Sequence, residues 1–365
     1  MPELVNKLRM AILNPRNALT ILLNRLRSNF SYYFLKTYAL GPETVNIYPT
    51  FRCNLKCEMC FEKYARVETE MDYADWVKII AEIKKFRPRV HISGGEPFVY
   101  KGILKLIEHI KKNNLYLHIT TNGTFLEDYA GELIKFNVNR IDISIDGAGD
   151  THDKIRGVKG TFNKIIKGLQ RLNNLKSRLP ILKINSIINI AHPETMNDII
   201  NIAQEYRINS IQFIYPLYLD AEALLKHEVF LANKIKKDLN YWCYASHYSP
   251  PLGDFFEIQG VINKLPKDKF IIEIFPNFNF DQFRAYYQSP QEFNKVYKGN
   301  CRALWNTATI LPDGSIESCP DYILGNIKEK EFFNSWNNQA MKELRALILD
   351  KKFFSVCRAC CFYYQ

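Results

Sequence analysis

Acidic side chains are missing from most of the N-terminal part of the chain. Between Leu4 and Pro42 there is neither Asp nor Glu, whereas the bases there are Lys7, Arg9, Arg16, Arg25, Arg27 and Lys36. Leucines and aromatic residues alternate with these bases, which predicts a basic amphipathic helix interrupted near Pro15. No apolar run in this segment is long enough to cross a bilayer. Residues 1–40 are therefore expected either to dock on an anionic membrane surface or acidic partner, or to pack across the bottom of the fold with their bases in water.

A secretory signal peptide is also missing, although the chain contains nine cysteines. This combination argues for a reducing compartment and for metal ligation in place of disulfides. We therefore expect a cytoplasmic protein, with peripheral contact to the inner face of the membrane as one of the two alternatives for residues 1–40. The formal net charge of +11 either attracts anionic partners or keeps the protein soluble, and nucleic acid is not the partner we expect. A chain of 365 residues can bury one large hydrophobic core or two modest ones.

Three of the cysteines, Cys53, Cys57 and Cys60, follow a short apolar run at 44–48 that is typical of a buried strand. Three thiols within eight residues suit an iron–sulfur cluster, which takes Cys thiolates as ligands. Such a cluster normally has four protein ligands and this loop supplies three, so one iron keeps an open position. A zinc site is the alternative, but zinc usually takes four ligands at paired spacings.

From Thr44 to about Tyr218, short β-rich runs alternate with amphipathic helical runs, which predicts a mostly parallel sheet with right-handed crossovers. The strands are expected at 44–49, 89–93, 115–120, 140–145, 181–188 and 210–215. The helices are expected at 72–86, 102–113, 126–136, 162–175 and 194–206. Six βα units in a row predict a partial (β/α)6 TIM-like barrel.

Several of these strands have one polar face. In the fourth strand Ile141 and Ile143 face one side, whereas Asp142 and Ser144 face the other, because side chains alternate along a strand. The apolar face should pack on the helices, which leaves polar side chains in the lumen. A βα barrel normally fills its interior with Val, Ile and Leu. The polar lumen therefore predicts a polar ligand inside it.

Turns with chemically useful residues follow the first four strands, at the carboxyl ends where βα barrels place their active sites. These turns are the cysteine loop, Gly94-Gly95-Glu96-Pro97, Asn122-Gly123 and Asp146-Gly147. With the Cys-x3-Cys-x2-Cys spacing, they make the chain resemble the radical S-adenosylmethionine (SAM) superfamily, although Met59 stands where most members have an aromatic residue. The resemblance implies that Cys53, Cys57 and Cys60 hold a catalytic 4Fe–4S cluster whose open iron chelates SAM. It also implies that an electron from this cluster cleaves SAM to a 5′-deoxyadenosyl radical.

The same resemblance implies a set of SAM contacts. The backbone of the Gly-Gly-Glu-Pro turn should bind the SAM amino group, because glycines admit close approach. Asp146 would accept from ribose hydroxyls or serve the substrate. Arg156 and Lys183 would bind the SAM carboxylate, or are instead solvated surface bases. The expected SAM-binding set is Gly94, Gly95, Glu96, Pro97, Thr120, Asn122, Ser144, Asp146, Arg156 and Lys183.

A second cysteine set lies near the C-terminus, at Cys301, Cys319, Cys357 and Cys360. Four thiolates suit a closed electron-transfer cluster or a structural zinc. Together with Gly314, their spacing makes this part resemble the SPASM/Twitch extension of radical SAM enzymes. The resemblance implies one auxiliary 4Fe–4S cluster, since the tail has too few cysteines for two. The adjacent Cys361 is the alternative to Cys360 as fourth ligand.

These interpretations divide the chain into four parts. They are a basic helical segment at 1–43, the partial barrel at 44–220, an aromatic-rich connector or lid at 221–298, and a small cysteine-rich α+β SPASM/Twitch-like domain at 299–365. The implied function is reductive cleavage of SAM and abstraction of a substrate hydrogen atom. The auxiliary cluster would relay electrons, and a flavodoxin or ferredoxin would supply them.

The basic N-terminal segment favours a substrate at the membrane, such as a lipid or lipid-linked glycan. A sugar or cyclitol is the further small-molecule class, with alcohol oxidation or C–C or C–X bond formation as the outcome. One alternative is a peptide-modifying maturase with a separate recognition partner, because the N-terminal segment is too short for a peptide-recognition domain of its own. Another is a non-catalytic iron–sulfur electron carrier, and a third is a SAM- or nucleotide-binding module with structural zinc.

Overall fold

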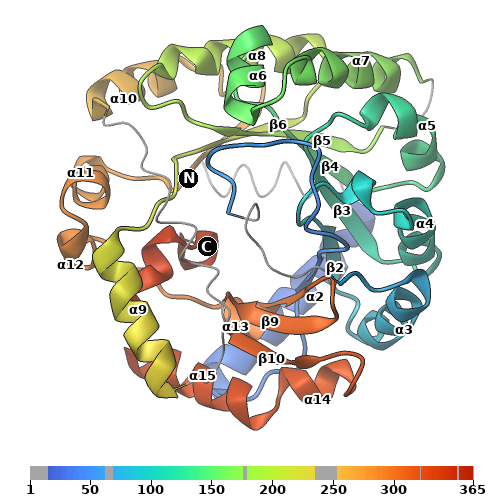
Figure 1. Cartoon of the computed structure of the whole chain (residues 1–365), viewed down its shortest axis with the longest axis vertical. Coiled ribbons are helices and arrows are strands. Elements are labelled where there is room, and N and C mark those ends of the chain that lie inside the picture. Colours follow the sequence, from blue (N-terminus) through green and yellow to red (C-terminus); the bar gives the residue numbers. More distant parts are fainter. Residues whose placement is uncertain are drawn as a thin grey trace.

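The computed structural model describes residues 15–61, 69–175, 179–234, 253–320, 322–351 and 353–364. Its centre is a ten-stranded sheet in the order β10-β9-β8-β1-β2-β3-β4-β5-β6-β7. Figure 1 shows the sheet curved into an open ring, with helices around its outer side and the loop after β1 in front of its centre. This mixed α/β architecture is the partial barrel that the sequence predicts.

All six predicted barrel strands are present, and each pairs in parallel with the next. They are β1 (Thr44–Ile47), β2 (Arg89–Ile92), β3 (Tyr116–Thr121), β4 (Arg140–Ser144), β5 (Ile181–Ile187) and β6 (Ser210–Ile214). The predicted helices between them are α3 (Tyr73–Ile83), α4 (Ile103–Lys112), α5 (Leu126–Lys135), α7 (Thr161–Asn174) and α8 (Met196–Glu205). The short helix α6 (Gly149–Arg156) was not predicted. Asp72 caps α3 by accepting a hydrogen bond from the Asp75 amide at 2.9 Å.

Two further parallel strands extend the sheet beyond the six predicted ones. β7 (Ile271–Phe275) pairs with β6, and β8 (Thr307–Ile310) pairs with β1. After β8 the chain turns through Pro312-Asp313-Gly314 into β9 (Ser315–Cys319) and β10 (Tyr322–Asn326), which continue the sheet as antiparallel strands. Segments that the sequence analysis assigned to the connector and to the C-terminal domain therefore lie in one sheet with the barrel.

The hydrophobic core lies between the sheet and the surrounding helices. Ile141 and Ile143 of β4 are fully buried, as are Trp76, Ile80 and Ile83 of α3 at helical spacing. Each such aliphatic side chain contributes about 1.5–3 kcal/mol by leaving water. The outward apolar faces of the strands are therefore committed to packing, and the opposite faces point into the lumen.

The remaining helices lie outside the six-strand unit. Within the predicted connector they are α9 (Ala221–Lys234), α10 (Phe255–Lys264), α11 (Phe280–Gln288) and α12 (Phe293–Val296), and after it α13 (Ala303–Asn306), α14 (Phe332–Trp336) and α15 (Gln339–Lys351). Figure 1 shows α9, α11 and α12 on the left of the ring, between α10 and the C-terminal elements. Residues 235–252 of the connector, which include the unassigned Cys243, lie outside the described residues.

The N-terminal segment forms α2 (Pro15–Phe30), which is followed by a π-helical stretch, η1 (Ser31–Leu35). Asn24 Nδ2 donates to the carbonyl of Arg87 at 2.8 Å, just before β2 begins. The helix therefore packs at the amino ends of the strands, and Figure 1 shows it behind the sheet. The bottom-packing alternative expected the bases in water, whereas Arg27 donates to two backbone carbonyls. Among the described helices, none combines the length and the apolar character needed to span a bilayer.

Candidate functional site

The cysteine loop after β1 is fastened to the carboxyl end of β3. Asn122 Nδ2 donates to Asn54 Oδ1 at 2.8 Å and lies 3.8 Å from the Cys53 sulfur. Asn54 Nδ2 in turn donates to Thr124 Oγ1 at 2.9 Å, and the Leu55 amide lies 3.4 Å from the Cys53 sulfur. The structure thus brings the predicted residues Cys53 and Asn122 together. The contributions of Asn54 and Thr124 were not predicted, because neither residue type carries a local signal for such a contact.

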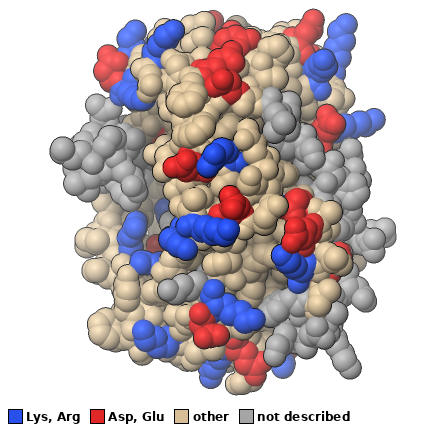
Figure 2. Space-filling view, turned by 90° about the vertical axis from the view of Figure 1, so that its left-hand side faces the viewer, with Lys and Arg blue, Asp and Glu red and all other residues tan. Residues whose placement is uncertain are grey.

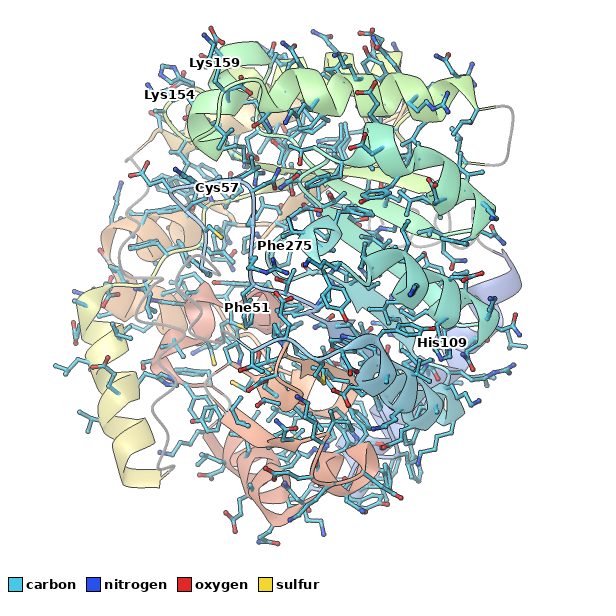
Figure 3. All side chains as sticks on the ribbon, turned by 45° about the vertical axis from the view of Figure 1, so that its right-hand side comes forward. Phe51, Cys57, His109, Lys154, Lys159 and Phe275 are labelled. Atoms are coloured by element: carbon cyan, nitrogen blue, oxygen red, sulfur yellow. The ribbon has the colours of Figure 1, made fainter. Side chains whose placement is uncertain are left out.

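The end of α6 holds the same loop at Cys57. Arg156 Nη1 lies 3.8 Å from the Cys57 sulfur, and the Arg156 carbonyl accepts from the Lys56 amide at 3.1 Å. Arg156 Nη2 also pairs with Asp146 Oδ2 at 2.6 Å, and both side chains are largely buried. Burial opposes the charge of Arg156, but Asp146 and the Cys57 sulfur outweigh it and raise the arginine pKa. Figure 3 shows Cys57 and Phe51 inside the ring of helices, whereas Lys154 and Lys159 lie at the edge of the molecule.

The two glycines of the Gly-Gly-Glu-Pro turn make room for the cysteine loop. A Cβ on Gly94, whose φ is +105°, would lie 2.6 Å from the Thr50 carbonyl oxygen. A Cβ on Gly95 would lie 2.3 Å from the Arg52 carbonyl oxygen. The amides of Gly95 and Glu96 donate to those same carbonyls, of Thr50 and Arg52, at 3.0 and 2.9 Å. Both glycines thus allow the backbone of the turn to approach another segment closely, and that segment is the protein's own cysteine loop.

Glu96 ties the turn after β2 to the end of β3. Its carboxylate accepts from the Asn122 amide at 2.7 Å, from Thr121 Oγ1 at 2.8 Å and from the Phe98 amide at 3.3 Å. Burial raises the pKa of Glu96 to about 7, although these three hydrogen bonds favour the ionised form. The side chain of Glu96 is therefore committed to the scaffold.

Asp146 at the end of β4 is held by the chain on both oxygens. Oδ1 accepts from the Ile187 amide at 2.8 Å, and Oδ2 faces Arg156. The Asp146 amide donates to Nδ1 of His152, a fully buried residue of α6. Burial, followed by the charge of Arg156, lowers the pKa of His152 to about 4, so it accepts this bond as a neutral ring. His152 was not predicted, and a lone His in a helix carries no signal for this role.

The deep part of the polar lumen is filled by a hydrogen-bonded network. His91 bonds Asn46 Oδ1 at 3.1 Å and Thr120 Oγ1 at 2.9 Å through its two ring nitrogens, and its ring stacks on His118 at 3.9 Å between centroids. Asn46 Nδ2 donates to Thr309 Oγ1 of β8 at 3.1 Å. Burial lowers the pKa of His91 to about 4. These polar residues bind one another, so their presence alone does not require a ligand there.

Nearer the carboxyl ends, a row of polar side chains crosses four strands. Ser144, Asn185, Gln212 and Glu273 are partners in register on β4, β5, β6 and β7, and all are partly exposed. Lys183 lies two residues before Asn185, about 7 Å deeper along β5. Its Nζ donates to Gln212 at 3.0 Å and to Glu273 at 3.1 Å. Lys183 and Arg156 are the two bases predicted to bind the SAM carboxylate. Each of them already pairs with a carboxylate of the chain, and their contact with SAM stays a prediction.

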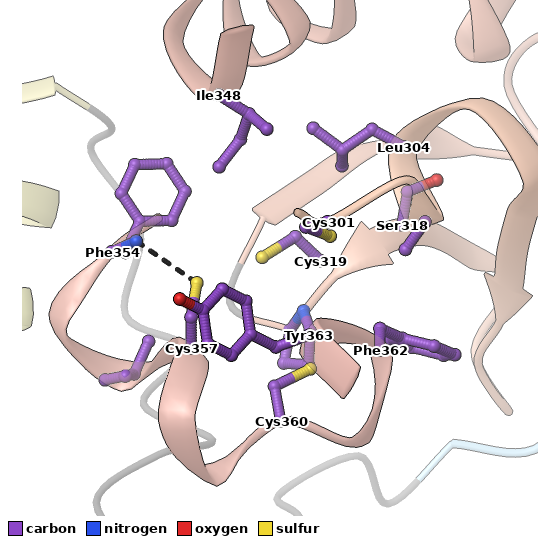
Figure 4. A pocket seen from close by; sticks show the side chains of 13 residues that line it. Cys301, Leu304, Ser318, Cys319, Ile348, Phe354, Cys357, Cys360, Phe362 and Tyr363 are labelled. Carbon is purple, nitrogen blue, oxygen red and sulfur yellow. Dashed lines mark hydrogen bonds between the residues drawn. The ribbon is translucent and has the colours of Figure 1, made fainter. Parts of the chain in front are cut away.

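Four C-terminal cysteines line one pocket, as Figure 4 shows. They are Cys301, Cys319, Cys357 and Cys360, from the residues just before α13, the end of β9 and the 3₁₀ segment Ser355–Ala359 with the residue after it. Apolar side chains such as Leu304, Ile348 and Val356 complete the walls. Cys361 is exposed and does not line this pocket, which favours Cys360 as the fourth ligand.

The surroundings of the first cysteine set fit an iron–sulfur cluster. Its sulfurs receive N–H donors from Leu55, Asn122 and Arg156, a common environment of Cys-ligated iron–sulfur clusters.

Comparison with known proteins agrees with this geometry. Residues 47–206 match the radical SAM superfamily, and residues 301–361 match SPASM, an iron–sulfur cluster-binding domain. The Fe-coproporphyrin III synthase of Methanosarcina barkeri is 29% identical over 173 residues, which are 46% of this chain and 43% of that protein. A GTP 3′,8-cyclase of Clostridium botulinum is 31% identical over 173 residues, which are 45% of this chain and 53% of that protein. The matched segment spans about half the length of these curated relatives.

Solved structures with the same fold include SuiB of Streptococcus suis bound to the precursor peptide SuiA. The likeness has a TM-score of 0.63 at 19% identity, and it covers 91% of this chain and 71% of that one. The enzyme anSMEcpe with bound AdoMet gives a TM-score of 0.57 at 20% identity, with 87% and 88% of the two chains covered. At these identities the likeness is one of fold.

The open parallel barrel, the three-cysteine loop at its carboxyl rim and the separate four-cysteine pocket define a protein built for two iron–sulfur clusters and SAM. Residues 47–206 therefore form a radical SAM domain, and residues 301–361 form a SPASM domain.

Proposed function

We propose that this protein cleaves SAM reductively and abstracts a hydrogen atom from a bound substrate. The observation that carries the proposal is the cysteine loop, whose three cysteines are all at least partly exposed while the loop itself is fastened on three sides. When bound there, a 4Fe–4S cluster with one open iron supplies the electron that converts SAM into methionine and a 5′-deoxyadenosyl radical. A flavodoxin or ferredoxin is the reductant we expect.

The chain's own residues hold the loop in place. Asn122 and Arg156 direct N–H groups at the sulfurs of Cys53 and Cys57. Glu96 fixes the Asn122 backbone, and Asp146 fixes the Arg156 side chain. We propose that the turn after β2 and Ser144, from the predicted SAM-binding set, line the same rim. Thr120 and Lys183 lie deeper in the lumen, where Thr120 bonds His91.

The auxiliary site is proposed to move electrons. Its four cysteines leave no position for a substrate on the metal, so a cluster held there is closed. The strand β8, which precedes Cys319, pairs directly with β1, which precedes the cysteine loop. Cys319 ends β9, which pairs with the other side of β8, so the two sites belong to one continuous sheet. This continuity supports the proposed electron relay between them.

For the substrate we propose a hydroxyl-rich molecule: a sugar, a cyclitol, or the glycan of a lipid-linked carrier. The supporting feature is the row Ser144, Asn185, Gln212 and Glu273, which presents hydroxyl, amide and carboxylate groups toward the lumen. Such groups accept and donate hydrogen bonds to alcohols. Alcohol oxidation, or C–C or C–X bond formation, is the expected outcome.

The cleavage step is tested by anaerobic reconstitution followed by dithionite and SAM. We expect 5′-deoxyadenosine and methionine to form, and we expect Cys57→Ala to abolish both products. Cys361→Ser is the matched control, because it removes an exposed cysteine outside the first cysteine set. Wild-type protein with about eight irons per chain that forms no 5′-deoxyadenosine would leave only the electron-carrier alternative.

The substrate class is tested with pools of deuterated sugars, cyclitols and peptides. Transfer of deuterium into 5′-deoxyadenosine identifies the molecule that loses hydrogen. We expect transfer from a polyol and a reduced yield in Gln212→Ala. Transfer from a peptide alone would instead support the maturase alternative with a separate recognition partner.

A further inference from the structure

The helix α2 is amphipathic in the reverse sense, with its apolar side facing solvent. Leu22, Leu23 and Leu26 are 53–55% exposed, and Leu19 is 65% exposed. The stripe continues beyond the helix through Phe30 and Phe34, which are 47% and 72% exposed and stack on each other at 5.1 Å. These residues recur at helical spacing and form one surface. The α2 apolar face is defined here as Leu19, Leu22, Leu23, Leu26, Phe30 and Phe34.

The polar side of α2 faces the protein and fixes this orientation. Asn24, Ser28 and Ser31 are buried. Arg27 donates to the carbonyl of Phe86 at 3.0 Å and to the carbonyl of Pro42 at 2.7 Å. Turning the helix over would bury the leucines but would leave these polar groups and backbone carbonyls without partners. The exposed apolar face is therefore a consequence of specific hydrogen bonds.

The charge around the face points to an anionic surface as its partner. Arg25 and Lys36 are exposed beside it, and the sequence from Leu4 to Pro42 contains no acidic residue. Elsewhere the charges are mixed: Figure 2 shows Lys and Arg interspersed with Asp and Glu on the side of the molecule that carries α9 and α11.

Leucines flanked by bases, with aromatic residues at the end, are typical of helices that lie in the membrane interface. The leucines enter the acyl boundary, the aromatic rings occupy the headgroup level, and each base near an anionic surface contributes about 1 kcal/mol. A protein partner with a large apolar patch would explain the leucines but not the absence of acidic residues over the whole segment.

We propose that α2 and η1 dock this protein on an anionic lipid bilayer through the α2 apolar face. The docking surface lies at the amino ends of the strands, where Asn24 and Arg27 bond the residues before β2. The cysteine loop lies at the opposite, carboxyl ends, as the order of β1 and its loop requires. Docking in this way turns the catalytic rim toward the aqueous phase.

This arrangement restricts the substrate and in that respect rests on the proposed function. A group that stays within the headgroup layer under α2 does not reach the rim, because the strands separate the two ends by roughly 15–25 Å. A soluble polyol reaches the rim freely. For a lipid-linked carrier, the reacting unit is one that extends far from the bilayer.

The docking is tested by flotation of the full reconstituted chain with vesicles of equal parts phosphatidylcholine and phosphatidylglycerol. We expect the protein to float with these vesicles and much less with pure phosphatidylcholine. In Leu22→Glu/Leu26→Glu the partition coefficient should fall at least about tenfold, because two apolar side chains no longer gain from burial and two negative charges are added. The control is Leu225→Glu/Val229→Glu on α9, which has the same spacing and similar exposure of 60% and 55%. It should float like the wild type.

Three results would overturn the proposal. One is equal flotation of the two double variants, and another is equal flotation with neutral and anionic vesicles. The third is a wild-type protein that does not bind vesicles and sediments as a dimer, whereas Leu22→Glu/Leu26→Glu sediments as a monomer. A second copy of the chain would then cover the α2 apolar face. The Leu22→Glu/Leu26→Glu protein should cleave SAM in solution like the wild type, so a failure of docking and a failure of the proposed chemistry are separate observations.

Discussion

The guanidinium of Arg156 lies 3.8 Å from the sulfur of Cys57, and no residue of the sequence between them suggests this contact. A positive charge that is buried beside a thiol and a carboxylate links the cysteine loop to β4. The loop geometry therefore depends on a side chain almost a hundred residues further along the chain.

We predict that Arg156→Ala destabilises the protein by about 3–5 kcal/mol, since it leaves the buried Asp146 carboxylate without its partner. Urea unfolding of the metal-free protein measures the effect. The control is the double variant Arg156→Ala/Asp146→Asn, which removes the charge as well and should recover part of the loss. If the double variant lost as much stability as Arg156→Ala and Asp146→Asn lose together, the two side chains would not be coupled.

Gly95→Ala should displace the cysteine loop, because the added Cβ would lie 2.3 Å from the Arg52 carbonyl oxygen. We expect the reconstituted variant to hold about four irons per chain in place of about eight, since the auxiliary pocket is untouched. Gly131→Ala in α5 is the matched control, as its Cβ meets nothing within 4 Å. Iron and sulfide analysis measures both, and a full complement in Gly95→Ala would contradict the packing role of this glycine.

Cys360→Ser and Cys361→Ser should differ, although the two residues are adjacent. Cys360 lines the auxiliary pocket and Cys361 does not. We expect Cys360→Ser to lose about four irons and Cys361→Ser to keep about eight. The EPR spectrum of the reduced auxiliary cluster gives a second readout. If only Cys361→Ser lost iron, Cys361 and not Cys360 would be the fourth ligand.

The lumen histidine His91 should make the protein sensitive to mild acid. Its pKa is lowered to about 4 by burial, whereas the unfolded chain has the usual value near 6.5. The unfolded state therefore takes up a proton first, and stability falls as the pH drops from 6.5 to 4, by at most about 3 kcal/mol for this group. His118 and His152, whose pKa values are also lowered by burial, act in the same direction.

The measurement is the free energy of unfolding across this pH range. In His91→Gln we expect a flatter dependence than in the wild type. The exposed residue His192 supplies the control variant His192→Gln, which should leave the slope unchanged. An identical slope in wild type and His91→Gln would contradict the assignment.

Local sequence pattern was sufficient for the six barrel strands and for the helices between them, because alternation and helical spacing are properties of neighbouring residues. It predicted short strands around the turn at Pro312-Asp313-Gly314, but not the pairing of β8 with β1, which lies more than 250 residues earlier. β7 was missed inside an aromatic-rich region that showed no clear alternation with helices. Pairing across such distances follows from the whole fold.

The site divides in the same way. The two cysteine sets and the rim turns were predicted from spacing, and the structure places Cys53 beside Asn122 and Cys57 beside Arg156. The polar lumen was predicted from alternation, but the mutual bonding of Asn46, His91 and Thr120 was not. The orientation of α2 was not predicted either. Periodicity identified an amphipathic helix, whereas the bonds from Arg27 to two carbonyls determine which side faces out.

The pairing of β8 with β1 has a consequence for any attempt to dissect the protein. Ending the chain before residue 299 would strip the hydrogen-bonding partner from β1 and expose its edge, along with the start of the cysteine loop. The fragment would tend to associate through that edge, and the first cluster would lose its support. The parts of the chain before and after residue 299 are therefore not separable modules. They share one sheet, so a truncated or chimeric protein has to keep both.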